Sequence, residues 1–391
     1  MYSLEMNEDW IQKKISESAK LGLKRTAAPQ PYTGGIIDNG GKRIINFSGN
    51  DYLNLSNHPY IIERSRKALE KYGCGSTASR LVSGTLPIHE ELEHHIAINK
   101  NQKTTLVYGS GYLTSLGTIP SLVNHRDIIF ADRLIHACMI DGCRLSGAKL
   151  VRFHHNNMDD LKSRIEKYPS NGNRRLILTE SLFSMDGDIS PLTEIAEIAK
   201  ENNAMLMIDE AHAMGIYGSN GSGRVAEHNL QSQTTVTMGT LSKALAGYGG
   251  YVCCSNRMRD YLINTSRSFI YTTAPPPAQI GAALGALEIL KKEPTLGDQL
   301  LKKADQFRKY LHINEINTLN SASHIIPILI GDNYKTVNIA NKLKEKDILV
   351  GAIRPPTVPK GTARLRISLS LAHSDDDISQ AAETIIRTIH S

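Results

Sequence analysis

The chain has 391 residues, 40% of them hydrophobic and 21% charged, and its formal net charge is +6 at pH 7. This length predicts two or three structural units with a sizeable buried core. The positive charge is mild and includes no run of Lys and Arg, which argues against a nucleic-acid-binding protein. No segment approaches the roughly 20 apolar residues needed to span a bilayer, and the N-terminus, MYSLEMNEDWIQKKISESAK, carries acids that targeting peptides lack. We therefore expect a cytoplasmic protein.

The predicted elements begin with an amphipathic helix over residues 3–25, with Trp10, Ile11 and Ile15 on or near one face, ended by the stretch APQPYTGG. From about residue 100, apolar or β-branched runs alternate with helical segments. The runs are TTLVYGS (104–110), DIIFAD (127–132), AKLVRF (148–153), RLILTESLF (175–183), AMLMIDEAH (204–212), TTVTMGT (234–240) and GYVCC (250–254). Such runs are typical of a mostly parallel sheet covered on both faces, so we expect an α/β fold with a seven-stranded sheet.

The C-terminal part has a different pattern. Residues 279–310 are predicted to form one long helix or two, and HIIPILIG (324–331), DILVGAI (347–353) and ARLRISLS (363–370) to form strands. The last helix begins at SDDDIS, where Ser374 is the expected N-cap and three acids face the helix dipole. The predicted domains are an N-terminal helix and extension (1–45), a large domain (46–285) and a smaller α+β domain (286–391).

The cysteines match neither a zinc site nor a redox pair in their spacing; they are Cys74, Cys138, Cys143, Cys253 and Cys254. Cys253 and Cys254 lie in an apolar run, so buried thiols in a reducing compartment are the simplest interpretation.

Polar residues end several of the apolar runs. Because ligands bind at the carboxyl ends of strands in such sheets, we expect these residues along one rim: Ser110, Asp132, Glu180, Asp209, His212 and Thr240. Lys243 follows one strand, in TMGTLSKALAGYGG, where a desolvated amine can act as a nucleophile, although most lysines are simply surface residues. Asp209 is costly to bury unpaired and could hold a pyridine nitrogen protonated. The alternative for Asp209 is a buried carboxylate that caps the next turn.

The spacing of Asp209, His212 and Lys243 favours the functional interpretation. Ser110-Gly111-Tyr112 follows a strand and opens a predicted helix, whose free N–H groups can bind phosphate, although such turns are common. His136 is a candidate for stacking on a ring, although a lone histidine is more often structural. An amine, an acid for a ring nitrogen, a stacking group and a phosphate cradle are what pyridoxal phosphate (PLP) requires. The sequence therefore predicts a PLP enzyme in which Lys243 carries the cofactor as a Schiff base.

Two other segments resemble ligand-binding motifs only superficially. In HEELEHH (89–95), His89 and His94 are five residues apart instead of the four that a zinc-protease helix needs. GSNGSGR (218–224) does not join a strand directly to a helix, as a dinucleotide loop must, and is predicted to be a turn.

Over nearly its whole length the chain resembles the α-oxoamine synthases, a family of fold-type I PLP-dependent transferases. The order, spacing and identity of many short motifs agree. They are NFSGNDYLNLSNHP (46–59), GSTASRLVSGTLPIHEELE (75–93), DRLIHACMIDGCRLSGAK (132–149), TESLFSMDGDISPL (179–192), IDEAHAMGIYG (208–218), GTLSKALAGYGG (239–250), YTTAPPP (271–277) and ARLRISLSLAH (363–373).

The resemblance implies roles for individual residues. Lys243 would bond the cofactor, Asp209 would face the pyridine nitrogen, His212 the ring oxygen, and His136 would stack on the ring. Glu180 and Ser184 would lie near the cofactor. Its phosphate would be held by Ser110, Gly111, Tyr112, Thr240 and, from the partner subunit of a homodimer, Thr272 or Thr273. The substrate-binding residues would be Arg25, Asn50, Arg354 and Arg366.

The segment AIRPPTVPKGTARLR (352–366) resembles the members that condense L-alanine with pimeloyl-CoA or pimeloyl-acyl carrier protein. No metal, membrane or nucleic acid is implied as a partner. One alternative is a member that uses glycine and acetyl-CoA. An alternative from another class is a non-catalytic PLP-binding regulator; such proteins usually carry a DNA-binding domain, and non-catalytic subunits usually lack the lysine.

Overall fold

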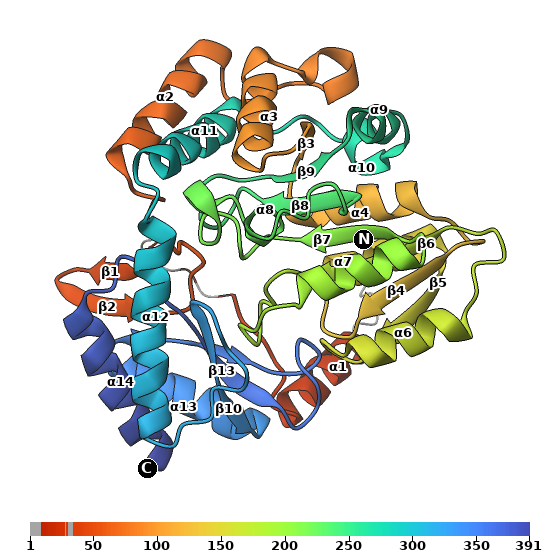
Figure 1. Ribbon diagram of the computed structural model, residues 1–391. Helices are drawn as coiled ribbons and strands as arrows, with labels where there is room; N and C mark the ends of the chain where they lie inside the picture. The colour runs from red at the N-terminus through yellow and green to blue at the C-terminus, as the bar shows by residue number, and fades with distance from the viewer. Residues whose placement is uncertain (1–8, 28, 30–33) are drawn as a thin grey trace, which may run out of the picture. The chain divides into compact units, whose positions relative to one another are not determined.

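The computed structural model describes residues 9–27, 29 and 34–391. The chain forms two compact units: Asn50–Lys302 is one, and the described residues up to Gly49 combine with Lys303–Ser391 in the other (Figure 1). The predicted division at residues 45 and 285 stays a prediction. Within the described ranges, no helix is both long and apolar enough to cross a membrane.

A seven-stranded sheet forms the centre of the larger unit, in the order β3-β9-β8-β7-β6-β4-β5. Its strands are β3 (Thr104–Tyr108), β4 (Ile128–Asp132), β5 (Lys149–Phe153), β6 (Arg175–Glu180), β7 (Met205–Asp209), β8 (Val236–Thr240) and β9 (Gly250–Cys254). β9 pairs antiparallel with both β3 and β8, and the other pairs in this sheet are parallel. The predicted seven-stranded, mostly parallel sheet is confirmed.

The pairing register aligns the ends of these strands. Glu180 lies opposite Asp209, and Tyr108 and Thr240 both lie opposite Gly250. The carboxyl ends of β3, β6, β7 and β8 therefore meet at one edge of the sheet, as expected for a ligand-binding rim.

Alternate residues of each strand face opposite layers of helices, which explains the near-continuous apolar runs. Ile129, Leu176 and Leu178 belong to a core with α4 (Gly111–Leu122), α5 (Ala137–Ser146) and α9 (Asn256–Thr265). Phe130 and Ile177 belong to a second core with α6 (Met158–Lys167), α7 (Leu192–Glu201) and α8 (Arg224–Glu227). The sheet is thus buried between two helical layers (Figure 1).

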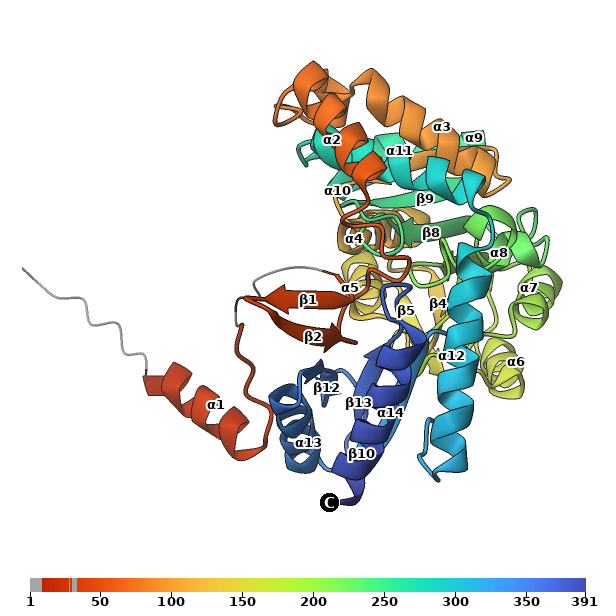
Figure 2. The ribbon, with the colours of Figure 1, turned by 90° about the vertical axis from the view of Figure 1, so that its left-hand side faces the viewer.

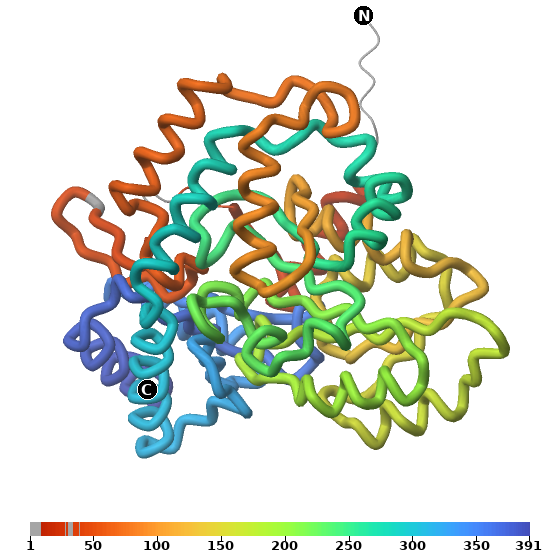
Figure 3. Tube along the Cα trace, turned by 45° about the horizontal axis from the view of Figure 1, so that its top comes forward, coloured from red at the N-terminus to blue at the C-terminus, as the bar shows by residue number. Residues whose placement is uncertain are grey.

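Three helices distant in sequence lie together in the same unit: α2 (Pro59–Tyr72), α3 (Pro87–Asn99) and α11 (Pro277–Lys292). The trace in Figure 3 shows α2 and α11 side by side. Gly281 permits this close approach, because a Cβ there would lie 2.7 Å from both the Ala68 Cβ and the Arg64 carbonyl oxygen. The remaining short helices of this unit are η1 (Arg80–Gly84), η2 (Ser219–Gly221) and α10 (Arg267–Ile270).

The other unit contains two three-stranded sheets (Figure 2). One has the order β1-β2-β11, with β1 (Ile36–Asn39), β2 (Lys42–Asn46) and β11 (Ile348–Leu349). The second has the order β10-β13-β12, with β10 (Ile325–Gly331), β12 (Gly351–Ile353) and β13 (Ala363–Ser368). The single strand predicted over 347–353 is wrong, because Val350 separates two strands that belong to different sheets.

Helix predictions for this part of the chain are largely confirmed. The segment 279–310 forms two helices, α11 and α12 (Leu296–Ile313), and α13 (Asn333–Glu345) precedes β11. Ser374 caps α14 (Asp375–His390) by accepting a hydrogen bond from the Asp377 N–H. The N-terminal helix α1 (Asp9–Lys20) ends before the predicted end at residue 25 and buries none of its described residues; positions 3–8 of the prediction lie outside the described residues.

Candidate active site

The carboxyl edge of the large sheet brings together the residues expected there. Lys243 lies in the turn after β8, and its Nζ is 2.7 Å from Nε2 of His212, which follows β7. The other ring nitrogen of His212, Nδ1, is 2.7 Å from the hydroxyl of Tyr52. That hydroxyl donates to Oδ1 of Asn50 at 3.0 Å. Lys243, His212, Tyr52 and Asn50 thus form a hydrogen-bonded row.

The direction of these hydrogen bonds fixes the tautomer of His212. The only hydroxyl hydrogen of Tyr52 points to Asn50, so Nδ1 of His212 must be the donor to the Tyr52 oxygen. In the neutral imidazole Nε2 is then an acceptor, and the Lys243 amine donates to it. The sequence analysis did not single out Tyr52, although it lies in the family motif NDYLN. The available signal was its burial, because a buried tyrosine hydroxyl needs a hydrogen-bond partner.

Two carboxyl groups lie side by side on β6 and β7, both almost completely buried. Burial raises the pKa of Asp209, and the Lys243 cation and the Ala211 N–H, 2.8 Å from its Oδ1, oppose that rise. Burial raises the pKa of Glu180 well above its usual range, and the charge of Asp209 raises it further. Because two adjacent buried carboxylates disfavour each other's charge, and the Ala211 N–H donates to Asp209, the pair favours an ionised Asp209 and a protonated Glu180.

His136 is the N-cap of α5, where its Nδ1 accepts a hydrogen bond from the Cys138 N–H at 3.2 Å. Burial lowers the pKa of His136, an effect that Asp209 opposes. The ring is therefore neutral and held at a helix start, as a stacking group must be. The backbone N–H of His136 opposes the rise in the pKa of Glu180, so this residue lies close to the paired acids. Ser184 is buried in the loop after β6.

The predicted phosphate-binding turn lies at the start of α4, where Ser110 is the N-cap and accepts from the Leu113 N–H. The first N–H groups of a helix have no partner within it and bind phosphate. The Thr240 hydroxyl lies beside it, within 2.6 Å of the Ser242 hydroxyl, and a Cβ on Gly111 would lie 3.6 Å from the Thr240 Oγ1. A larger residue than Gly111 would thus fill the space beside the Thr240 hydroxyl.

The remaining predicted phosphate ligands are less enclosed. The Tyr112 side chain is exposed and its hydroxyl donates to Asp141, so only its backbone could serve a phosphate. Thr272 is half-buried near Gly109, and Thr273 is exposed and pairs with Ser79 in an isolated bridge.

Three of the predicted substrate residues lie in the other unit. Arg366 is buried in β13, and its Nη1 donates to the Ser368 hydroxyl at 2.7 Å. Arg354 donates to the Gly22 carbonyl at 2.6 Å, and burial together with the nearby Arg25 lowers its pKa. Arg25 itself donates to Thr357 Oγ1 at 3.4 Å. The structure therefore brings Arg25 and Arg354 together.

The rejected motifs have structural roles. His89 is fully buried: its Nδ1 accepts from the Leu86 N–H and its Nε2 bonds the Pro275 carbonyl, which fixes the start of α3. GSNGSGR forms the short turn η2 and the start of α8. All five cysteines are free, and Cys253 and Cys254 are buried, as predicted. Among the described residues, no cluster of three or more His, Cys, Asp or Glu side chains could hold a metal.

Comparison with known proteins places these residues in a family. The sequence model of the aminotransferase class I and II family matches residues 42–385. The 8-amino-7-oxononanoate synthase of Maricaulis maris is 42% identical, over 93% of this chain and 91% of its own. A serine palmitoyltransferase structure from S. paucimobilis with bound PLP superposes with a TM-score of 0.91 at 27% identity, covering 99% of this chain and 98% of that one. The 8-amino-7-oxononanoate synthase structure from Francisella tularensis gives 0.78 at 31% identity, covering 89% and 98%.

Proposed function

Since the chain belongs to the aminotransferase class I and II family and, within it, to the α-oxoamine synthases, we propose that it is an 8-amino-7-oxononanoate synthase. In this reaction of biotin biosynthesis, L-alanine and a pimeloyl thioester condense with loss of the thiol and CO2. The observation that carries the proposal is the row Lys243–His212–Tyr52 beside the buried Asp209 at the carboxyl edge of the sheet.

The residues at this edge fit PLP. Lys243 would hold its aldehyde carbon, Asp209 its ring nitrogen, His212 its ring oxygen, and the start of α4 with Thr240 its phosphate. Bound PLP supplies an electron sink for the charge that develops at the alanine Cα. His136 would cover one ring face, and the proton on Glu180 limits the negative charge near Asp209, which keeps Asp209 as the single anion for the ring nitrogen.

Lys243 is the group that would move protons. When alanine occupies the site, the freed Nζ would take the proton from Cα and later return one to the product. An amine serves as a base only when it is uncharged. The hydrogen bond to Nε2 of His212 would orient Nζ for this transfer.

The substrate residues remain part of the proposal. Arg366 and Asn50 would bind the alanine carboxylate, because a guanidinium binds a carboxylate with two parallel hydrogen bonds. Arg25 and Arg354 would attract the anionic acyl substrate; two neighbouring guanidinium groups repel each other and favour an anion. We further propose a cytoplasmic homodimer whose partner subunit supplies Thr272 or Thr273 to the phosphate.

Product analysis by mass spectrometry tests the proposal. The protein with PLP is incubated with L-alanine and pimeloyl-CoA, with L-alanine and pimeloyl-acyl carrier protein, or with glycine and acetyl-CoA, each also with Lys243→Ala. We expect 8-amino-7-oxononanoate from one or both pimeloyl donors and only with Lys243 present. Product from the glycine reaction alone would assign a glycine C-acetyltransferase. PLP binding without any product would favour the non-catalytic regulator.

A further inference from the structure

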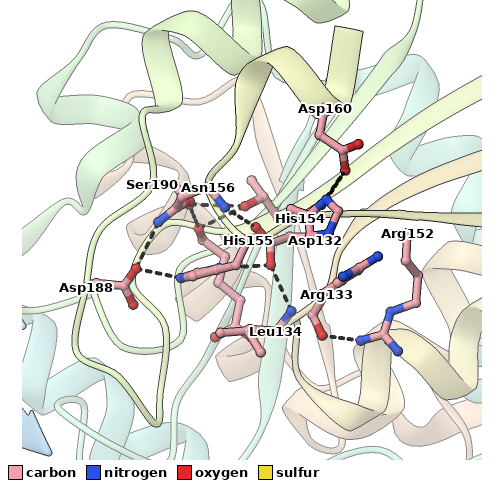
Figure 4. Close-up of polar contacts among 12 residues, drawn as sticks. Asp132, Arg133, Leu134, Arg152, His154, His155, Asn156, Asp160, Asp188 and Ser190 are labelled. Atoms are coloured by element: carbon pink, nitrogen blue, oxygen red, sulfur yellow. Dashed lines mark hydrogen bonds and ion pairs between the residues drawn. The ribbon is translucent and has the colours of Figure 1, made fainter. Parts of the chain in front are cut away.

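An ionic cluster lies at the ends of three strands of the large sheet, apart from the residues assigned to the cofactor. Figure 4 shows His155, after β5, between two carboxylates. Its Nδ1 is 3.0 Å from Oδ1 of Asp132, the last residue of β4, and its Nε2 is 2.7 Å from Oδ2 of Asp188, in the loop after β6. The Asp132 and Asp188 side chains are almost fully buried.

The geometry requires His155 to be doubly protonated. Each ring nitrogen faces a carboxylate oxygen, and a carboxylate can only accept, so both nitrogens must donate. Burial would lower the pKa of His155, but its hydrogen bonds to Asp132 and Asp188 and the charges of these two groups raise it to about 10. His155 is thus an imidazolium throughout the physiological range and bonds both carboxylates at once.

The residue after His155 strengthens the same connection. The Asn156 N–H donates to Asp132 Oδ2 at 2.8 Å, and its side-chain amide donates to Asp188 Oδ2 at 2.9 Å. Ser190 completes the link, because its hydroxyl donates to the Glu180 carbonyl at 2.6 Å and its N–H to the Ser181 carbonyl at 3.3 Å. The loop 181–190 is therefore fixed to the ends of β4 and β5.

Both segments joined by His155 carry residues assigned to the cofactor. Asp132 Oδ1 also accepts from the Leu134 N–H at 2.8 Å, which shapes the turn that leads to His136. In the loop 181–190, Ser184 follows Phe183, whose ring packs edge-on to the His155 ring with centroids 4.4 Å apart. A change at His155 would therefore be transmitted to His136 through one carboxylate and to Ser184 through the other.

We propose that His155 is a positioning residue of the cofactor pocket: by bonding Asp132 and Asp188 together, it fixes the His136 turn and the Ser184 loop at the spacing that the PLP ring needs. The inference rests on the proposed PLP function of this edge. It predicts that loss of His155 disturbs the orientation of the bound cofactor even where the fold is retained.

His154 offers a matched control, because it is a neighbouring histidine that also contacts a carboxylate. Its Nδ1 is 2.8 Å from Oδ2 of Asp160 in the first turn of α6, and its side chain is 53% exposed. His154→Gln and His155→Gln thus each remove an imidazole that contacts a carboxylate, at two adjacent positions. Only the second substitution removes a contact to the segments that carry His136 and Ser184.

The test compares these two variants with the wild-type holoenzyme by visible circular dichroism of bound PLP, by PLP titration and by thermal unfolding. We expect His155→Gln to weaken PLP binding by about tenfold and to change the dichroism of bound PLP at saturation. His154→Gln should stay within twofold of the wild type in affinity and keep its spectrum. Wild-type dichroism and PLP affinity in His155→Gln would overturn the proposal, even if its melting temperature fell.

Asp188→Asn provides a second variant if His155→Gln does not fold, because it preserves shape and leaves the contact between His155 and Asp132. A change in cofactor dichroism in the same direction supports the proposal, and an unchanged spectrum contradicts it. These readouts require PLP but no substrate. A wild-type protein with bound PLP and no product would therefore refute the proposed reaction without affecting the inference about His155.

Discussion

Tyr52 has one hydroxyl hydrogen, and its direction decides which nitrogen of His212 can accept from Lys243. With the hydroxyl donated to Asn50, Nδ1 of His212 is protonated and Nε2 is available to the amine. The tyrosine side chain is 1% exposed, so water does not take the place of its hydroxyl group when that group is removed. The Tyr52 hydroxyl therefore determines how the hydrogen bond between His212 and Lys243 is arranged.

Tyr52→Phe should lower kcat by roughly tenfold, which corresponds to about 1.4 kcal/mol in the barrier. The substitution leaves the Nδ1–H of His212 without its acceptor, a defect that costs about 1–3 kcal/mol in buried sites. The alternative tautomer, which would donate from Nε2 to Lys243, becomes accessible. Steady-state kinetics of product formation would measure the change, and an unaltered kcat would show that His212 keeps its tautomer by other means.

Tyr251→Phe is the matched control for this prediction. Tyr251 is fully buried on β9, and its hydroxyl has no hydrogen-bond partner in the structure. Removing a buried hydroxyl that is not hydrogen-bonded is neutral or stabilising, by up to about 1–3 kcal/mol. For Tyr251→Phe we expect an unchanged kcat, in contrast to the lower kcat of Tyr52→Phe. Its melting temperature should equal or exceed that of the wild type.

At the scale of elements, α14 begins with a capping box that also reaches β2. Asp377 accepts hydrogen bonds from the Ser374 N–H at 2.9 Å and its hydroxyl at 2.8 Å, and Arg43 of β2 donates to both carboxylate oxygens. The hydrogen bond from Arg43 holds the pKa of Asp377 well below its usual range. The carboxylate thus stabilises the helix start and its attachment to the sheet, provided that it is ionised.

Asp377→Asn should reduce the free energy of unfolding at pH 7 by about 1–2 kcal/mol, a value kept small because Arg43 is half-exposed. Since the folded-state pKa lies below the unfolded-state value, the wild-type contribution is complete above about pH 4 and is lost as the pH falls further. The variant should therefore show a weaker loss of stability below pH 4. Urea unfolding between pH 3 and 7 would measure this.

Asp375→Asn is the control, because Asp375 is in the same first turn but is 83% exposed, and it forms a surface ion pair with Lys303. An exposed ion pair of this kind contributes about 0–1 kcal/mol. Equal effects of the two substitutions would contradict the role assigned to the capping box.

Gly281→Ala in α11 should destabilise the protein by about 1–3 kcal/mol through overpacking against α2. The sign of this change in stability is diagnostic, because a Gly-to-Ala substitution in an exposed helix stabilises the protein by about 1 kcal/mol. The added methyl group would lie 2.7 Å from backbone and side-chain atoms of α2. Thermal unfolding of the variant measures the effect, and an increase in melting temperature would mean that α2 moves away without cost.

For the whole molecule, the parallel sheet and the row of polar strand ends could be predicted because each strand carries its own apolar run, as RLILTE and MLMID do. The pairing of β2 with β11 could not, since Ile45 and Ile348 are brought together only by folding of the entire smaller unit. Likewise, nothing local in the sequence marks Tyr52 as the partner of His212, 160 residues away. Long-range polar pairs have no periodicity, so only the structure reveals them.

Arg366 offers the most direct test of the proposed substrate recognition. If Arg366 binds the alanine carboxylate, Arg366→Ala should weaken alanine binding by roughly 1.5–3 kcal/mol, the contribution of a charged hydrogen bond. The control is Arg364→Ala, on the same strand and also buried, whose Nε and Nη2 donate to Thr362 at 2.9 and 3.0 Å. Loss of Arg364 should lower stability without changing alanine affinity. Spectral titration of the PLP-bound variants with alanine separates the two, and equal affinities would remove Arg366 from the substrate site.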